Sequence, residues 1–272
     1  ELASIAWEFR QRQPMSESSR QLALLRQAAG ARTLGLSGRA STQLAEASQL
    51  PGPYRLAAVS ELQLELSNGI SPLPIFNIRQ ARSRPILDAV LDDDCWVHAE
   101  EVFLEAPRGA SDQAKTLILM SWDQEFLYLA ARCEAVSDQP LLPVTGERYH
   151  DADHGRRDRL TVTFDTDRDY DTAFEFVVDQ SGQTSERCDL LTGWNPQWYV
   201  ANAVDQAGWR IEAAIPLDSL TPQPVFAGHA WGIRLSREIP GVFSQRLCGE
   251  QELPIELNGA GVMRFIRPPR TR

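Results

Sequence analysis

The chain has 272 residues, of which 43% are hydrophobic and 24% charged, as is usual for a globular protein with a substantial core. Its net charge of −10 at pH 7 leaves no excess of lysine and arginine to neutralise phosphates, which argues against nucleic acid and anionic lipid as general partners. No apolar run approaches the roughly 18 residues of a membrane span, so we expect no such span.

The N-terminal part of the chain is predicted to be largely helical. Residues 16–29 carry apolar side chains at helical spacing behind a serine cap, and residues 41–50 predict a second short helix that prolines end. Leu62, Leu64 and Leu66 alternate with polar residues, a pattern that predicts a half-buried strand.

Near residue 75 the residue pattern changes. From there on, short runs typical of β-strands are separated by segments rich in turn-forming residues. Residues 75–272 are therefore predicted to be one mainly β domain, an antiparallel β-sandwich of jelly-roll or immunoglobulin-like type. Residues 1–74 are expected to be a helical or linker segment that belongs to a longer polypeptide with upstream domains. The clearest predicted strands are residues 116–121, 126–133, 159–164, 173–178, 209–215 and 231–237.

Six motifs follow one another in the predicted β domain. They are PILDAVLDDDCW at 85–96, SWDQEFLYLAARC at 121–133, DRLTVTFDTDRDY at 158–170, GWNPQWYV at 193–200, GWRIEAAIPLDSL at 208–220 and WGIRLSREIP at 231–240. In this order they resemble the family 9 carbohydrate-binding modules and related DOMON-like domains. The resemblance implies a non-catalytic, extracellular or periplasmic β-sandwich that holds an oligo- or polysaccharide. Ala89 departs from the family pattern, which usually has glycine there.

The fourth motif crowds three aromatic rings around a proline. Such rings can form a flat platform on which sugar rings stack, while neighbouring amides bond the hydroxyls. The alternative is an ordinary strand in which Trp198 and Tyr199 alternate and only Trp194 is exposed. The predicted carbohydrate-binding residues are Trp194, Asn195, Gln197, Trp198 and Tyr199, together with Arg159.

Four carboxylates alternate along the segment that follows the third motif, at Asp165, Asp167, Asp169 and Asp171. The glycine and glutamate of an EF-hand loop are missing from their expected positions. The resembling modules often carry structural calcium, so the resemblance implies a calcium site here, and we expect no other cofactor. The alternative is a solvated turn that Arg168 neutralises.

No arrangement typical of an enzyme emerges. The sequence lacks a G-x-S-x-G elbow, and its 37 acidic residues single out no pair for glycoside hydrolysis, so we expect no catalysis. The group HDADH at 150–154 combines histidines with carboxylates, but it is predicted to be a solvated surface loop. A structural domain of a secreted protein and a haem-binding sandwich are the alternatives, although the possible axial ligands form no recognisable pair: Met120, Met263, His98 and His229.

Several residues are predicted to have structural roles. Trp96, Trp209 and Trp231 lie in or beside strand-like apolar runs and are expected in the core. Glu212 is expected to be buried and paired with Arg210, Arg159 or Arg234. The four cysteines are compatible with two disulfides or with four buried thiols.

Overall fold

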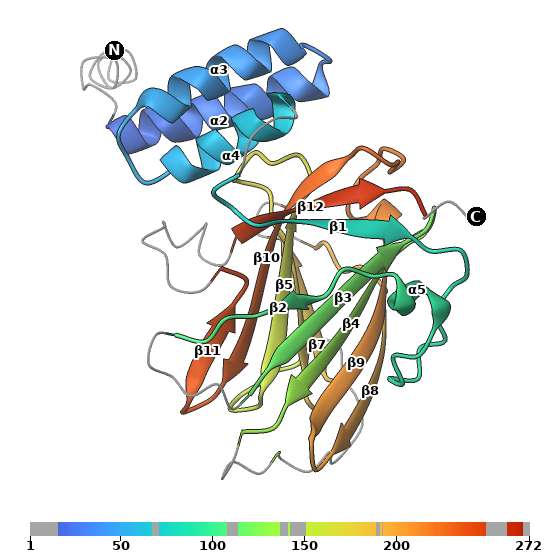
Figure 1. The fold of residues 1–272 in the computed structure, drawn as a ribbon. Helices are drawn as coiled ribbons and strands as arrows, with labels where there is room; N and C mark the ends of the chain where they lie inside the picture. The colour runs from blue at the N-terminus through green and yellow to red at the C-terminus, as the bar shows by residue number, and fades with distance from the viewer. Residues whose placement is uncertain are drawn as a thin grey trace. The chain divides into compact units, whose positions relative to one another are not determined.

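The computed structural model describes residues 16–66, 71–107, 114–136, 141, 151–188, 191, 193–248 and 260–268. The chain forms two compact units, one up to Pro72 and one from Leu73 onward. The first unit is helical and the second is mainly β (Figure 1).

The helical unit consists of α2 (Glu17–Thr33), α3 (Ser37–Gln49) and α4 (Arg55–Leu66). The side chain of Ser16 caps α2 by accepting a hydrogen bond from the backbone N–H of Ser19 at 3.1 Å. None of the described helices is long and apolar enough to cross a membrane.

The strand predicted at Leu62, Leu64 and Leu66 is wrong, because these residues lie in α4. Leucine, glutamate and glutamine are all strong helix formers, so the alternation of leucine with polar residues does not decide between the two structures. The buried side of α4 includes Glu61, whose carboxylate lies 3.0 Å from Nη1 of Arg32 in α2. The packing of the three helices therefore decides that this segment is helical, although its leucines alternate with polar residues as in a strand.

The β unit contains twelve described strands and two short helical segments. All six predicted strands are present, with ends within two residues of the prediction. The strands are β1 (Ile75–Gln80), β2 (Val102–Phe103), β3 (Thr116–Trp122), β4 (Phe126–Glu134), β5 (Arg159–Asp165), β6 (Phe174–Asp179), β7 (Thr184–Cys188), β8 (Tyr199–Asp205), β9 (Gly208–Pro216), β10 (Ala230–Ile239), β11 (Phe243–Arg246) and β12 (Ala260–Ile266), and the helical segments are α5 (Asp94–Val97) and η1 (Leu217–Ser219).

Ten of the strands form one continuous, curled sheet in the order β7-β6-β5-β10-β12-β1-β3-β4-β9-β8, and beside this path β11 pairs with β10 and β2 with β3 (Figure 1). The mainly β class is confirmed, whereas the pairing joins the strands into one sheet instead of two separate ones. The join is β1, which pairs in parallel with β12 on one side and with β3 on the other. Because β1 links both halves, the sheet can curl around a single core.

That core lies on the inner face of the curled sheet and unites side chains from both halves. Phe265 of β12 packs edge-on against Trp122 of β3 and Trp231 of β10, with ring centroids 5.3 and 4.8 Å apart. The predicted burial of Trp96, Trp209 and Trp231 is confirmed, since each is at most 4% exposed. Aromatic packing thus connects the two halves where β1 joins them.

A second, smaller cluster covers the outer face of β3, β4 and β9. Trp96 of α5 packs there, and its Nε1 donates to Oε1 of Glu212 at 2.7 Å. The other oxygen of Glu212 accepts the backbone N–H groups of Asp88 at 3.0 Å and Ala89 at 2.8 Å. The arginine partner predicted for Glu212 is therefore wrong, and Arg210 instead pairs with Asp205 at 2.7 Å. Glu212 pins the loop before α5 onto β9.

Ala89 occupies the place where the resembling family usually has glycine, and the backbone explains that preference. Its φ angle is +62°, in the left-handed region that glycine adopts most easily. The alanine methyl is fully buried and its N–H is bonded to Glu212, so tertiary contacts hold the strained conformation.

Three of the cysteines, Cys95, Cys133 and Cys188, are separate buried thiols. Burial raises the pKa of Cys95 and of Cys133 to about 12. These two thiols are therefore protonated and unreactive at neutral pH.

Candidate functional site

The aromatic segment enters β8 in an extended form, with side chains that alternate between two sides. Asn195, Gln197 and Tyr199 are exposed, and Tyr199 retains 45% of its accessible surface. Trp198 points the opposite way and is only 3% exposed. The segment therefore does not present its three rings on one open platform.

The two tryptophans of this segment are held by core contacts. Nε1 of Trp198 donates to Oε2 of Glu186 at 2.9 Å, and its ring meets Phe176 edge-on with centroids 5.1 Å apart. Trp194 is half-buried, packs 5.4 Å from Phe176 and donates from Nε1 to the carbonyl of Ser219 at 2.9 Å. The alternative in which only Trp194 is exposed is therefore wrong, and Tyr199 is the exposed ring of the segment.

Tyr199 belongs to a surface that the sequence did not single out. The centroid of its ring lies 6.2 Å from that of Phe126. The guanidinium of Arg84 lies over the Phe126 ring, 5.4 Å from its centroid. Nη2 of Arg84 approaches the carboxylate of Glu125 at 2.7 Å, and its Nε approaches Asp123 at 3.1 Å. We call Tyr199, Phe126, Arg84 and Glu125 the Tyr199 surface.

The turn that supports the Tyr199 surface joins β3 to β4. Oδ1 of Asp123 accepts the backbone N–H groups of Glu125 and Phe126 at 2.7 and 2.8 Å. The hydroxyl of Tyr128 donates to the other oxygen at 2.8 Å, and burial together with this carboxylate raises the pKa of Tyr128. The side chain of Asp123 therefore closes this turn.

Arg159 lies apart from this segment in its contacts. It bonds from Nη1 to the carbonyl of Gly155 at 3.3 Å and forms an ion pair with Glu238. The sequence analysis predicted that Arg159 binds sugar together with the aromatic residues. In the described chain its polar contacts are instead with Gly155 and with Glu238 of β10.

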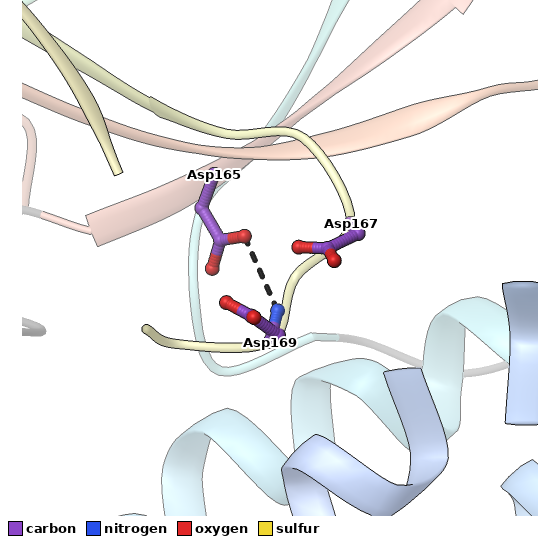
Figure 2. A group of neighbouring side chains, drawn as sticks. All are labelled: Asp165, Asp167 and Asp169. Atoms are coloured by element: carbon purple, nitrogen blue, oxygen red, sulfur yellow. Dashed lines mark hydrogen bonds between the residues drawn. The ribbon is translucent and has the colours of Figure 1, made fainter. Parts of the chain in front are cut away.

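Three of the four predicted metal ligands converge, as Figure 2 shows. Asp165, Asp167 and Asp169 each offer one oxygen, and these atoms lie within 4.8 Å of one another, whereas Asp171 is outside the group. Asp165 accepts the backbone N–H groups of Asp169 at 3.2 Å and Tyr170 at 2.9 Å. Burial, reinforced by the neighbouring carboxylates, raises the pKa of Asp165 to about 8. Three crowded carboxylates fit a hard cation such as calcium, which prefers oxygen ligands.

Two further groups of candidate residues are the HDADH segment at 150–154 and the four possible axial ligands of haem. His154, predicted to lie in a solvated loop, is 9% exposed and bonds to Asp179 and Ser185, while His150 lies outside the described residues. Met120 and Met263 are packed in the apolar core, His98 is exposed beside α5, and His229 is half-buried against the ring of Phe226.

Comparison with known proteins identifies the fold. No protein-family model and no curated protein sequence matches the chain. The structure is similar to a family 9 carbohydrate-binding module from Caldicellulosiruptor kristjanssonii in complex with cellotriose, with a TM-score of 0.53 and 14% identity over 72% of this chain and 95% of that one. The same kind of module in complex with glucose has a TM-score of 0.50 and 16% identity, over 72% of this chain and 98% of that one. The matched part of the chain thus has the family 9 module fold.

Proposed function

We propose that the β unit is a carbohydrate-binding module that holds an oligo- or polysaccharide without acting on it. The observation that carries the proposal is the fold shared with modules that hold cellotriose and glucose. An extracellular or periplasmic location follows from such a ligand, since polysaccharides of this kind lie outside the cytoplasm.

The Tyr199 surface is the proposed sugar-binding site. Tyr199 offers an open ring face for stacking, and Phe126 supports it edge-on. The exposed amides of Asn195 and Gln197 precede it, and the Arg84 guanidinium adds donors for hydroxyl groups. Behind the segment, the buried Trp198 and the half-buried Trp194 support it.

Replacement Tyr199→Ala is expected to weaken binding of a cello-oligosaccharide about fivefold to tenfold, because a well-placed aromatic contact contributes about 1 kcal/mol. Isothermal titration calorimetry measures this. The control Tyr199→Phe keeps the ring and should retain most of the affinity.

Replacement Trp198→Phe separates the two sides of the segment, because it removes the hydrogen bond to Glu186 on the inner side. If Trp198→Phe abolishes binding and Tyr199→Ala does not, the sugar binds on the inner side and the Tyr199 surface is the wrong site. If the unaltered chain binds no glycan in an array, the carbohydrate proposal itself fails and a structural domain replaces it.

We also propose that Asp165, Asp167 and Asp169 hold a structural calcium ion. Without the ion, Asp165 binds its proton more tightly in the folded chain than in the unfolded one, since its folded pKa is raised to about 8. The stability that this proton contributes is complete below the ordinary carboxylate pKa of about 4 and is lost as the pH rises through about 8.

Calcium is therefore expected to raise the melting temperature at pH 8, and chelator should leave a melting temperature that falls between about pH 5 and pH 8. Differential scanning fluorimetry measures both effects. Asp165→Asn mimics the protonated group and should flatten the pH slope and remove the calcium response, whereas Asp171→Asn lies outside the cluster and should keep both. An unaltered chain that ignores calcium and chelator at pH 8 contradicts the site.

A further inference from the structure

Three side chains from separate segments form a hydrogen-bonded series in the order Ser185, His154, Asp179. Nε2 of His154 lies 2.8 Å from Oγ of Ser185, and Nδ1 lies 3.2 Å from Oδ2 of Asp179. With the ring proton on Nδ1, His154 donates to Asp179 and accepts the Ser185 hydroxyl. This order of serine, imidazole and carboxylate is the one that activates a serine for acyl transfer.

Asp179 is oriented by bonds that do not involve the histidine. It ends β6 and is completely buried, and its Oδ1 accepts the N–H of Ser181 at 2.8 Å, the hydroxyl of Ser181 at 2.7 Å and the N–H of Gln183 at 3.2 Å. Burial raises its pKa, but the hydrogen bonds from His154, Ser181 and Gln183 outweigh burial, so the pKa is below its usual value. Asp179 is therefore an ionised, fixed partner for the imidazole.

His154 is held just as firmly by its own loop. The N–H of Ala152 bonds to the carbonyl of Thr184 in β7 at 3.0 Å, which attaches the loop to the strand that carries Ser185. Oδ1 of Asp153 accepts the N–H of Gly155 at 2.9 Å, and the carbonyl of His154 accepts from Arg157 at 3.0 Å. The imidazole is thus fixed between the end of β6 and the middle of β7.

Solvent exposure decreases along the series from the serine to the carboxylate, as expected for a nucleophile with a buried base behind it. Ser185 lies on β7, the end strand of the sheet order, and is half-exposed. His154 and Asp179 behind it are 9% and 0% exposed. The serine is therefore the most exposed member of the series, while the base and its orienting carboxylate are shielded from water.

We propose that Ser185 is a reactive nucleophile that His154 activates and Asp179 positions, and that it reacts with small esters. Oγ of Ser185 forms a bond to the acyl carbon while its proton passes to Nε2 of His154. The ester C–O bond breaks, and the imidazolium returns this proton to the departing alkoxide. Water then attacks the acyl group by the same route and regenerates the serine. The proposal is independent of sugar binding.

A fluorophosphonate probe tests the proposal on the full chain, because it forms an O–P bond with an activated serine and releases fluoride. Mass spectrometry of the digest is expected to find the label on Ser185. His154→Gln should slow this labelling at least about 100-fold, as for loss of a general base. Ser185→Ala should remove it, whereas Ser236→Ala, a half-exposed serine on β10, should not change it.

A second pair of variants tests whether labelling is lost because the protein unfolds rather than because the base is missing. Ser185→Cys should react with iodoacetamide faster when His154 is present than in the Ser185→Cys, His154→Gln double variant, and circular dichroism confirms that each variant folds. An unlabelled unaltered chain, a label on another residue, or labelling that persists in His154→Gln overturns the proposal and leaves a structural hydrogen-bond network.

Discussion

Replacement Asp158→Ala is expected to destabilise the β unit by about 3–5 kcal/mol, the cost of leaving a buried charge without its partner. Arg237 of β10 is completely buried, and its Nε and Nη2 bond to the two oxygens of Asp158 at 2.9 and 2.6 Å. The other guanidinium bonds, to Thr116 at 3.1 Å and the carbonyl of Glu134 at 2.8 Å, do not neutralise the charge. Asp158 alone supplies a carboxylate to Arg237 among its hydrogen-bond partners in the described chain.

Urea unfolding followed by tryptophan fluorescence measures this loss, since six of the seven tryptophans lie in the β unit. The double variant Asp158→Leu, Arg237→Met is the control, because replacing both charges by apolar groups is expected to recover most of the stability. A single variant that loses less than about 1 kcal/mol would show that water reaches Arg237 and that the ion pair is not a buried one.

Replacement Glu212→Ala is expected to cost at least about 3 kcal/mol, because three N–H donors lose their common acceptor at about 1–3 kcal/mol each. The donors are Trp96 Nε1 and the backbone groups of Asp88 and Ala89. The loop before α5 should then loosen on β9, where the bond from Nε of Arg210 to the carbonyl of Ala89 at 3.2 Å remains.

Hydrogen exchange measured by mass spectrometry locates this effect. Exchange should accelerate in residues 86–97 of Glu212→Ala while β5 and β6 retain their protection. Glu212→Gln keeps one acceptor oxygen and is expected to lose less stability. Faster exchange spread evenly over the whole unit would mean that Glu212 supports the core rather than the loop.

The strands of this protein follow from local signals. Apolar and β-branched runs at 116–122 and 159–165 are bounded by turn residues, and each becomes a strand close to its predicted ends. The turn at Asp123 and the burial of Trp209 are equally local, since a short polar break and a large ring in an apolar run leave few alternatives. Local patterns were insufficient for α4, where helix packing decided.

The aromatic segment shows where local reasoning stops. That three rings lie within six residues is visible in the sequence, but which of them face water depends on the register between β8 and β9. Pairing of Tyr199 with Ala214 puts the tyrosine on the outer face and leaves Trp198 turned toward Phe176. A shift of one residue would have exposed the other ring.

The sequence by itself determined the mainly β class, the positions of the principal strands and the buried tryptophans, because those properties depend on neighbouring residues. Only the tertiary structure decided the partners of Glu212, the convergence of Asp165 with Asp167 and Asp169, and the series of Ser185, His154 and Asp179. Long-range contacts bring Glu212 onto Asp88, 124 positions away, and no spacing rule encodes such a pairing. Even for the local carboxylates, left-handed backbone at Arg168 and Tyr170 turns the chain so that alternate side chains meet.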